Sequence, residues 1–455
     1  MTALYDSKSN LDDRQIKELF TERSKISSWL KVEAALAKAQ GEIGIIPSEA
    51  ALEIENKCKV ENIDFNKMNK IKKNVGHGFV PFIKVLVDVC GDEAGKYVHY
   101  GVTTQNIQQT AQLSLLKQAL NKIKSFVYDC LDNLADIAEE HAETVLPGRT
   151  HGKHAIPITY GFKVSVWISE LLSSLERIEE SEKRIFLVMM GGAVGSFNSL
   201  GSAGRKVQTR VAELLNMGEM DVSSRNMSIH KIEYISNLAM LCNTFHKIAE
   251  EVYYTGIEEF GEVSERFTPG TIGSSTMPQK INPKLSKGII ANSQKLYSIV
   301  PLGYFSSVRL FEGDSSSYML FDGLLEEATE LCTEVVIRAE ELTRTLTVNK
   351  EKMLYNANLN KGLDNTENIM MKLAAKIGKD QAHQLMYEKA IQTEIQHQDY
   401  LSLLKNDPTI SSLFTEDEIV QMTDPTNYIG EGASIAKEMA SKARLMSKNH
   451  RISSI

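Results

Sequence analysis

The stretch LSLLKQALNKIKSFVYDCLDNLADI, residues 113–137, decides the fold class of this chain. Its apolar residues recur in alternating steps of three and four, in the series Leu113, Leu116, Leu120, Ile123, Val127, Cys130, Leu134 and Ile137. Such steps place the apolar side chains along one stripe of an α-helix, a pattern typical of helices that pack nearly parallel in a bundle. The stretch therefore predicts one long helix of a bundle.

A second stripe and the placement of proline extend this prediction to the rest of the chain. The same spacing recurs in Val164, Ile168, Leu171, Leu175, Ile178 and Ile185, with only Glu182 interrupting it. Proline is absent from 158–268 and from 302–407, and because proline breaks helix interiors, such gaps permit long helices. Alternating patterns typical of strands are scarce and short. We therefore predict an all-α chain.

Turn signals and the position of the stripes suggest three domains. We expect an N-terminal helical domain over residues 1–110, a central long-helix bundle domain over 111–355, and a C-terminal helical domain over 356–455. Apolar stripes on several helices exceed what one chain usually covers by itself, so we expect a homo-oligomer. A long monomeric bundle is the alternative.

Composition excludes several classes of protein. The net charge of −8 leaves no basic excess with which to displace counterions from nucleic acid. The five cysteines lie far apart without a CxxC pair, so neither a disulfide framework nor a cysteine zinc site is indicated. The N-terminal sequence shows no signal-peptide pattern, and no apolar run reaches membrane-spanning length. We expect a cytoplasmic protein without nucleic-acid or membrane partners.

Three polar islands interrupt the helical pattern: VHYGVTTQNI (98–107), LPGRTHGKHAIPITYG (146–161) and GSSTMPQKINP (273–283). They are rich in Ser, Thr, His, Lys, Arg and Asn and nearly free of Asp and Glu, which suits a substrate that carries carboxylates. Taken singly, each has a plainer interpretation. Thr103 and Asn106 favour helix caps. His151 and His154 could be metal ligands on a helix face, but no third ligand is suitably spaced, and we expect no metal site.

Together the islands resemble the conserved regions of the fumarase/aspartase superfamily. GSSTMPQKINP matches every fixed position of that family's signature loop, GSSxMPxKxNP. TTQN resembles the first conserved region, and GRTHGKHAIPITYG resembles the second in the form found in adenylosuccinate lyases and 3-carboxy-cis,cis-muconate cycloisomerases. MMGGAVGSFNSLG (189–201) matches the segment that follows. The resemblance extends from about residue 12 to about residue 450.

The resemblance implies a three-domain subunit and a homotetramer whose central helices form a twenty-helix core. Each active site would be assembled from three subunits and would use no cofactor. The reaction implied is β-elimination of fumarate from a succinyl compound, in which a proton next to a carboxylate is removed and an aci-carboxylate dianion develops.

The resemblance also implies roles for individual residues. Ser274 would be the general base and His151 the general acid, while Lys280 and Asn282 would stabilise the developing charge. The residues expected to bind or line the substrate are Ser275, Met277, Thr103, Thr104, Gln105, Asn106, Arg149, Thr150, His99 and His77, with Arg225 and Arg309 as more distal contacts. For His77, a structural loop histidine is an equal alternative.

The chain departs from the adenylosuccinate lyase pattern where that pattern binds the nucleotide. Leu4-Tyr5 replaces an Arg-Tyr pair, Gly313 and Tyr318-Met319 stand where arginines are usual, and Arg225 lies near the position of a glutamine. These changes weaken a nucleotide phosphate as the ligand, because a phosphate dianion needs several donors. We therefore predict a lyase that releases fumarate from a small N-succinyl or amino-dicarboxylate compound, with adenylosuccinate itself included. The alternatives are a muconate-type cycloisomerase and a non-catalytic structural tetramer.

Overall fold

The computed structural model describes residues 8–266, 276–321 and 323–453. The chain is mostly helical with a few short strands, which confirms the all-α fold class. It forms two compact units, which are described separately: unit 1 contains residues 1–126, 174–243 and 291–337, and unit 2 contains 127–173, 244–290 and 338–455. The three-domain division at residues 110 and 355 stays a prediction.

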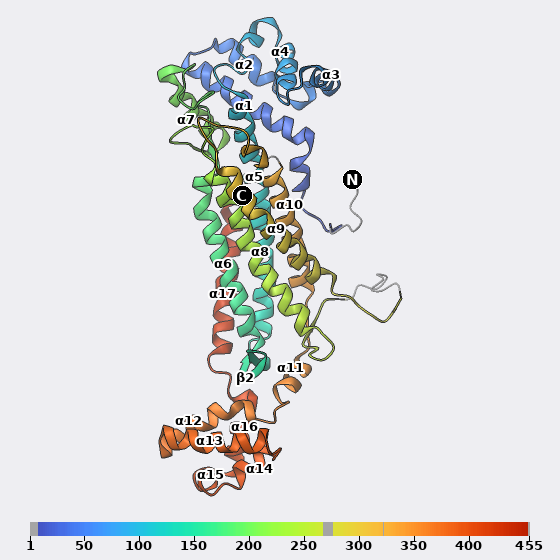
Figure 1. Cartoon of the computed structure of the whole chain (residues 1–455), viewed down its shortest axis with the longest axis vertical. Coiled ribbons are helices and arrows are strands. Elements are labelled where there is room, and N and C mark those ends of the chain that lie inside the picture. Colours follow the sequence, from blue (N-terminus) through green and yellow to red (C-terminus); the bar gives the residue numbers. More distant parts are fainter. Residues whose placement is uncertain (1–7, 267–275, 322, 454–455) are drawn as a thin grey trace. The chain divides into compact units, whose positions relative to one another are not determined.

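Helices make up most of the described chain, and several of them are long (Figure 1). They are α1 (Glu22–Ile43), α5 (Thr104–Glu140), α6 (Tyr160–Ile185), α8 (Ile229–Thr255), α9 (Lys284–Ser307), α10 (Leu324–Thr345) and α17 (Gly432–Ser453). The shorter helices are α2 (Ser48–Lys57), α3 (Phe65–Val75), α4 (Val80–Ala94), α7 (Gly204–Leu215), α11 (Lys350–Ala357), α12 (Thr366–Ile377), α13 (Lys379–Glu394), α14 (Tyr400–Lys405), α15 (Pro408–Leu413) and α16 (Glu416–Thr423). No helix in the described ranges is long and apolar enough to cross a membrane.

The apolar stripe of residues 113–137 lies on α5, the longest helix of the described chain. Every member of the stripe is buried except Ile137, which is half-buried near the end of the helix. The stripe of α6 is buried as well, and Glu182, which interrupts it, forms an ion pair with the nearly buried Lys124 of α5. Because a buried cation needs a counter-charge, the polar interruption is a contact between two helices rather than a break in the pattern.

The proline-free gaps contain several helices each. The first holds α6, α7 and α8, and the second holds α10 to α14. Pro301, which bounds the second gap, lies inside α9. The proline-free ranges therefore permit long helices but do not show where each helix ends, because glycines and turns also end helices.

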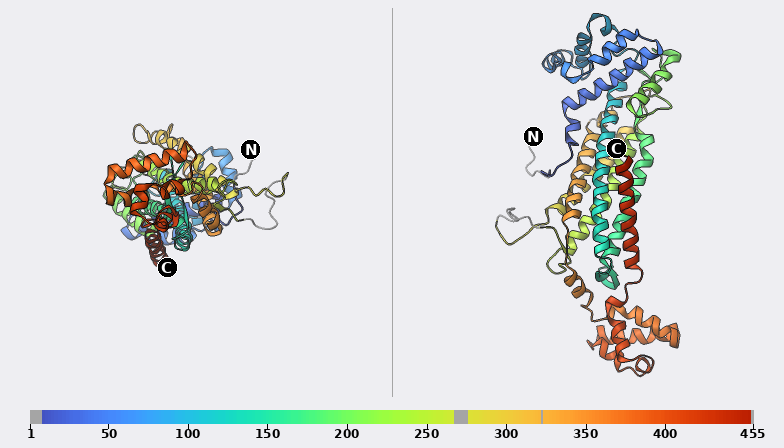
Figure 2. Two further views of the ribbon diagram at one scale, coloured as in Figure 1. Left: turned by 90° about the horizontal axis from the view of Figure 1, so that it is seen from below. Right: turned by 180° about the vertical axis from the view of Figure 1, so that it is seen from behind.

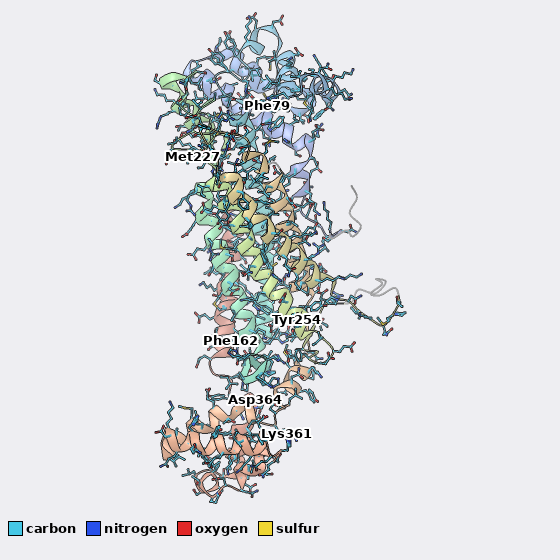
Figure 3. All side chains as sticks on the ribbon, viewed as in Figure 1. Phe79, Phe162, Met227, Tyr254, Lys361 and Asp364 are labelled. Atoms are coloured by element: carbon cyan, nitrogen blue, oxygen red, sulfur yellow. The ribbon has the colours of Figure 1, made fainter. Side chains whose placement is uncertain are left out.

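In unit 1, α1 packs against α2 and α7, and Figure 2 shows this group from two further directions. Trp29 is the centre of an aromatic cluster, with its ring centroid 4.9 Å from that of Phe79 and 5.3 Å from that of Phe82; Phe79 is labelled in Figure 3. The same apolar core takes in residues from Val188 to Ala212, so this later segment belongs with the N-terminal helices.

Polar contacts tie the bundle helices of unit 1 together. Asn237 of α8 donates to Ser181 Oγ of α6 over 2.8 Å, and the Tyr234 hydroxyl lies 2.8 Å from that of Thr329 on α10. All four side chains are buried or nearly so, and a buried polar group is costly unless it is hydrogen-bonded. These pairs therefore fix how the helices face one another.

In unit 2, the second polar island is a β-hairpin. Strands β1 (Val145–Thr150) and β2 (Lys153–Thr159) pair antiparallel, from Val145 opposite Thr159 to Thr150 opposite Lys153. The chain then enters α6 at Tyr160.

The other strands are two residues long: β3 (Leu187–Val188) pairs with β4 (Gly218–Glu219), and β5 (Val263–Ser264) pairs with β6 (Thr347–Val348). Helices α12 to α16 enclose a separate apolar cluster that includes Ile369 and Tyr400.

Candidate active site

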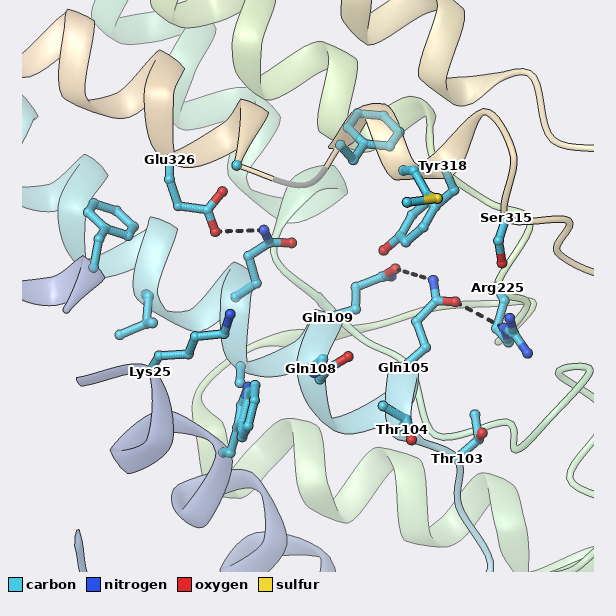
Figure 4. Close-up of a pocket in the computed structure, with 18 of the residues that line it drawn as sticks. Lys25, Thr103, Thr104, Gln105, Gln108, Gln109, Arg225, Ser315, Tyr318 and Glu326 are labelled. Carbon is cyan, nitrogen blue, oxygen red and sulfur yellow. Dashed lines mark hydrogen bonds between the residues drawn. The ribbon is translucent and has the colours of Figure 1, made fainter. Parts of the chain in front are cut away.

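A cavity of about 670 Å³ lies in unit 1, at the start of α5 (Figure 4). The side chains that line it are mostly polar: Phe20, Lys25, Trp29, His77, Thr103, Thr104, Gln105, Gln108, Gln109, Ala111, Gln112, Leu115, Arg225, Ser315, Tyr318, Met319, Phe321, Gly323 and Glu326. Five residues predicted from the sequence are among them, namely His77, Thr103, Thr104, Gln105 and Arg225. The cavity is therefore the candidate substrate site of this unit.

The TTQN motif begins α5, as expected from its residue types. Asn106 Oδ1 accepts hydrogen bonds from the backbone N–H of Thr103 (3.0 Å) and of Gly192 (3.1 Å). Asn106 is the third residue of α5, and by accepting from the N–H of Thr103 it does what the third residue does in a capping box. It is fully buried and does not line the cavity, and its substrate contact stays a prediction. Thr103 and Thr104 line the cavity at the N-terminal end of α5, and this end of a helix favours an anionic ligand.

Gln105 links the helix to Arg225. The Arg225 Nε–H donates to Gln105 Oε1 over 2.9 Å, and Gln105 Nε2 donates to Gln109 Oε1 over 3.2 Å, as the dashed lines of Figure 4 show. The Arg225 Nη atoms lie 3.3 Å from the carbonyl oxygen of Ala193 and 3.4 Å from that of Gly313, near the upper limit for a hydrogen bond. Arg225 thus places a guanidinium on the cavity wall.

Arg309 lies behind this guanidinium and does not line the cavity. Its own guanidinium donates to the carbonyl oxygens of Asp314 (2.8 Å), Gly313 (2.9 Å) and Arg225. It also lies 4.0 Å from the ring centroid of Tyr318, whose hydroxyl accepts from Lys231 over 2.9 Å. Burial, with Arg225 close by, lowers the pKa of Arg309. Arg309 therefore fixes the backbone around Arg225, and its contact with a substrate stays a prediction.

His77 makes structural contacts in its loop and also lines the cavity, and its contact with a substrate stays a prediction. Its Nδ1 accepts from the backbone N–H groups of Phe79 (3.1 Å) and Val80 (3.2 Å), which caps the start of α4. Because Nδ1 is the acceptor, the neutral ring carries its proton on Nε2. The ring also lines the cavity, so His77 is a loop histidine that offers one N–H donor to a ligand.

The opposite side of the cavity carries Lys25 and Glu326 (Figure 4). Gln112 Nε2 donates to Glu326 Oε1 over 2.8 Å, while the buried Glu326 Oε2 has no hydrogen-bond partner. A carboxylate oxygen without a donor is costly in a buried place and suits a ligand N–H or O–H group. This side of the cavity thus presents one cation and one acceptor.

The second island lies in unit 2, where Arg149 is engaged by a carboxylate. Arg149 makes a two-bond ion pair with the fully buried Glu262, one bond measuring 3.0 Å, and Asn356 also donates to Glu262 over 2.8 Å. The Phe260 ring centroid lies 4.9 Å from the guanidinium carbon. These contacts favour a structural role for Arg149, and its contact with substrate stays a prediction.

His151 lies at the tip of the β1–β2 hairpin with a left-handed backbone, φ +53°, and its side chain is exposed, as is that of Thr150. His154, on β2, approaches Asp364 Oδ2 at 3.3 Å, where Figure 3 labels Asp364. The two histidines are therefore on a hairpin, and the interpretation that placed them on a helix face is wrong. The two prolines of this segment, Pro147 and Pro157, disfavour a helix between them.

The signature loop is described only in part. Ser274 and Ser275 lie outside the described residues. Met277 and Lys280 are exposed and joined by a turn in which the Lys280 N–H donates to the Met277 carbonyl over 3.0 Å, and Asn282 is half-buried. Just after the loop, the Glu265 carboxylate caps α9 by accepting from the N–H groups of Leu285 and Ser286 at 2.9 and 2.7 Å.

His99 does not line the cavity. Its Nδ1 lies 2.7 Å from Oε1 of the buried Glu33, and its ring centroid is 5.4 Å from that of Phe79. Its backbone is left-handed, with φ +58°. These contacts fix His99 within the apolar core of unit 1, and its contact with substrate stays a prediction.

Several lining residues were missed from the sequence: Lys25, Gln108, Gln109, Gln112, Ser315 and Glu326. Tyr318 and Met319, which also line the cavity, were noted only as departures from the adenylosuccinate lyase pattern. A signal existed for the glutamines. In QNIQQTAQ (105–112) they recur in helical steps, which places them on the face of α5 that carries Gln105. Lys25 and Glu326 come from other helices and had no local signal.

Comparison with known proteins identifies the family. A model of the family "Lyase" matches residues 10–295, and a model of "Adenylosuccinate lyase C-terminus" matches residues 362–439. The chain belongs to the fumarase/aspartase superfamily of lyases. The adenylosuccinate lyase of Methanocaldococcus jannaschii is 34% identical to this lyase, with 93% of each chain covered. An N-acetyl-S-(2-succino)cysteine lyase of Dickeya dadantii is 30% identical, with 95% of each covered.

Solved structures show that the fold of this lyase is shared. A fumarate lyase from Mesorhizobium has a TM-score of 0.88 at 28% identity, covering 96% of this chain and 100% of its own. A 3-carboxy-cis,cis-muconate lactonizing enzyme from Pseudomonas putida has a TM-score of 0.86 at 26% identity, covering 95% and 97%. The similarity spans nearly the whole lyase chain.

Proposed function

We propose that this lyase releases fumarate by β-elimination from a succinyl compound whose leaving atom is nitrogen or sulfur. The observation that carries the proposal is the full-length similarity to an adenylosuccinate lyase, in a chain whose unit 1 cavity is lined by the TTQN motif. The relative named N-acetyl-S-(2-succino)cysteine lyase supports the same elimination with sulfur as the leaving atom.

The chemistry requires a base, an acid and donors for a developing dianion. Ser274 removes the proton from the carbon next to the distal carboxylate, and the electron pair moves onto that carboxylate as an aci-carboxylate. The pair then returns to form the fumarate double bond, the carbon–nitrogen bond breaks, and His151 gives the leaving nitrogen a proton. Lys280 and Asn282 hold the extra negative charge, and a lysine ammonium or amide N–H suits this role.

The exposed position of the proposed acid supports a shared active site. His151 is exposed at a hairpin tip, and Lys280 is exposed in the signature loop, so neither is sequestered within its own chain. The family resemblance assigns such residues to sites completed by neighbouring copies in a tetramer. We therefore include the homotetramer, and a small dicarboxylate substrate, in the proposal.

A muconate-type cycloisomerase is the second candidate, favoured by the structural similarity to the lactonizing enzyme of Pseudomonas putida. The test is to incubate the purified protein with adenylosuccinate, small N-succinyl amines and 3-carboxy-cis,cis-muconate, and to follow fumarate by ultraviolet absorbance. We expect fumarate from at least one succinyl compound. Consumption of the carboxymuconate alone would establish the cycloisomerase, and inertness toward all of them would favour the structural tetramer.

A further inference from the structure

The positions at which this chain departs from the adenylosuccinate lyase pattern come together at one corner of the unit 1 cavity. Arg225, Tyr318 and Met319 line that corner, and the Gly313 carbonyl lies 3.4 Å from Arg225 Nη2. They come from two segments far apart in the sequence. The succinyl half is the same whatever the leaving group, so residues that change between related lyases are expected to contact the part of the substrate that changes.

The corner carries a cation at position 225, and a side chain at position 313 would be strained and crowded. Gly313 has φ +124°, a conformation in which a side chain is strained. A Cβ there would lie 3.1 Å from Arg225 Cβ and 3.3 Å from Arg309 Nη2. An arginine at 313, as in the adenylosuccinate lyase pattern, would therefore strain the backbone and require the side chains of Arg225 and Arg309 to shift. This chain therefore carries its cation at Arg225, whereas the adenylosuccinate lyase pattern carries one at the position of Gly313.

The Arg225 guanidinium is oriented without being neutralised. Its one short contact is to the neutral Gln105 amide, at 2.9 Å, and its two carbonyl contacts are long, at 3.3 and 3.4 Å. In the part of the chain that the structure describes, no carboxylate pairs with it. Its charge and its Nη–H groups are therefore available to an anion in the cavity.

We propose that Arg225 determines the specificity of this lyase by binding a carboxylate on the leaving group. A guanidinium fits a carboxylate through two parallel hydrogen bonds, whereas a phosphate dianion calls for more donors than this corner supplies. The substrate class is then the succinyl adduct of an amino acid or of an N-acylated amino acid, joined through nitrogen or sulfur. This inference rests on the proposed function.

The test uses matched substrates that differ only in the leaving-group carboxylate. One pair is N-acetyl-S-(2-succino)cysteine and N-acetyl-S-(2-succino)cysteamine, and the other is N-(carboxymethyl)aspartate and N-ethylaspartate, with adenylosuccinate as the nucleotide. Fumarate release is followed for the wild type, Arg225→Gln and Arg225→Lys. The matched control is Arg184→Gln, which removes an exposed arginine of the same unit that pairs with Glu233.

We expect the wild type to prefer the carboxylated member of the pair that it cleaves. Arg225→Gln should raise KM for that member about 10- to 100-fold, the range for losing a charged hydrogen-bond donor, and leave the other member unchanged. Arg225→Lys should keep part of the preference, and Arg184→Gln all of it. Activity on the carboxylate-free member shows that the variant is folded.

Three results would overturn the inference. Equal loss on both members would mean that Arg225 binds the succinyl half or only supports the structure. If the wild type shows no preference, or prefers adenylosuccinate, then Arg225 does not select a leaving-group carboxylate. The proposed release of fumarate would still hold in that case. Release of fumarate from none of these compounds would overturn the proposed function and this inference with it.

Discussion

Arg309 illustrates how a buried charge positions a neighbour. Its guanidinium donates to three backbone carbonyls, including that of Arg225, and burial lowers its pKa. We expect Arg309→Gln to lower kcat/KM about tenfold, because one charged hydrogen bond is worth about 1.5–3 kcal/mol and the loop that faces Arg225 would loosen. The effect should fall on KM for the carboxylated substrate. Arg309→Lys should restore part of it, and an unchanged KM for Arg309→Gln would contradict the positioning role.

His230 gives stability a dependence on pH. It is buried at the start of α8 with no hydrogen-bond partner for Nε2, and burial, assisted by Lys231, lowers its pKa to about 3 from an ordinary 6.5. Below pH 6.5, His230 takes up a proton in the unfolded chain but stays neutral in the folded chain until the pH approaches 3. Its contribution to stability is therefore complete above pH 6.5 and is lost as pH falls toward 3.

The measurement is urea unfolding at pH 7.5 and 5.5. Wild type should lose about 1.4 kcal/mol more over this interval than His230→Leu, which is the linkage energy of one pH unit below the unfolded pKa. His383→Leu, a change of an exposed histidine, is the control and should behave as wild type. Equal pH dependence of wild type and His230→Leu would show that His230 is protonated without cost in the fold.

Among individual residues, the sequence correctly placed in the cavity those that lie within a recognisable motif. Thr103, Thr104 and Gln105 line the cavity as expected, and Arg225 was found as a departure from the pattern. Glu326 and Lys25 could not be found in this way, because their place in the cavity depends on how α10 and α1 pack within unit 1 rather than on neighbouring residues. Ser274 lies outside the described residues, and its role stays a prediction.

Among the elements, helix α6 begins with a close approach that only glycine permits. A Cβ on Gly161 would lie 2.4 Å from the Ala138 carbonyl oxygen, 2.8 Å from Ala142 Cα and 2.9 Å from Ala436 Cβ. Gly161→Ala should therefore destabilise the protein by about 1–3 kcal/mol, as overpacking does, despite the better helix propensity of alanine. Thermal or urea unfolding checks this. The control Gly78→Ala meets nothing within 4 Å and should change stability little.

The elements also show where periodicity was a sufficient guide. Steps of three and four identified α5 and α6, because burial of one stripe requires that spacing. The hairpin β1–β2 was missed, because a short paired segment gains its stability from hydrogen bonds across the pair and leaves a weak pattern. Gly161 could not have been singled out, since its neighbours come from α5 and α17.

For the whole molecule, the similarity to solved lyases confirms the fold class and the family, while the tetramer stays a prediction. If active sites combine residues from different copies, two inactive variants should restore activity when mixed. We expect co-expressed Ser274→Ala and His151→Gln chains to regain part of the fumarate release that each lacks alone, since some sites then hold both intact residues. Light scattering would verify the assembly. Assemblies that mix yet stay inactive would place both residues in one copy's site.

The central claim, that this lyase forms fumarate with Ser274 as the base, has one direct test. Fumarate release is measured for wild type and Ser274→Ala on the succinyl compound that wild type cleaves best, with substrate binding followed by calorimetry. We predict a loss in kcat of about 10²–10⁴-fold, the usual contribution of a general base, with binding retained. A near-normal rate for Ser274→Ala, or no fumarate from any succinyl compound with the wild type, would contradict the account.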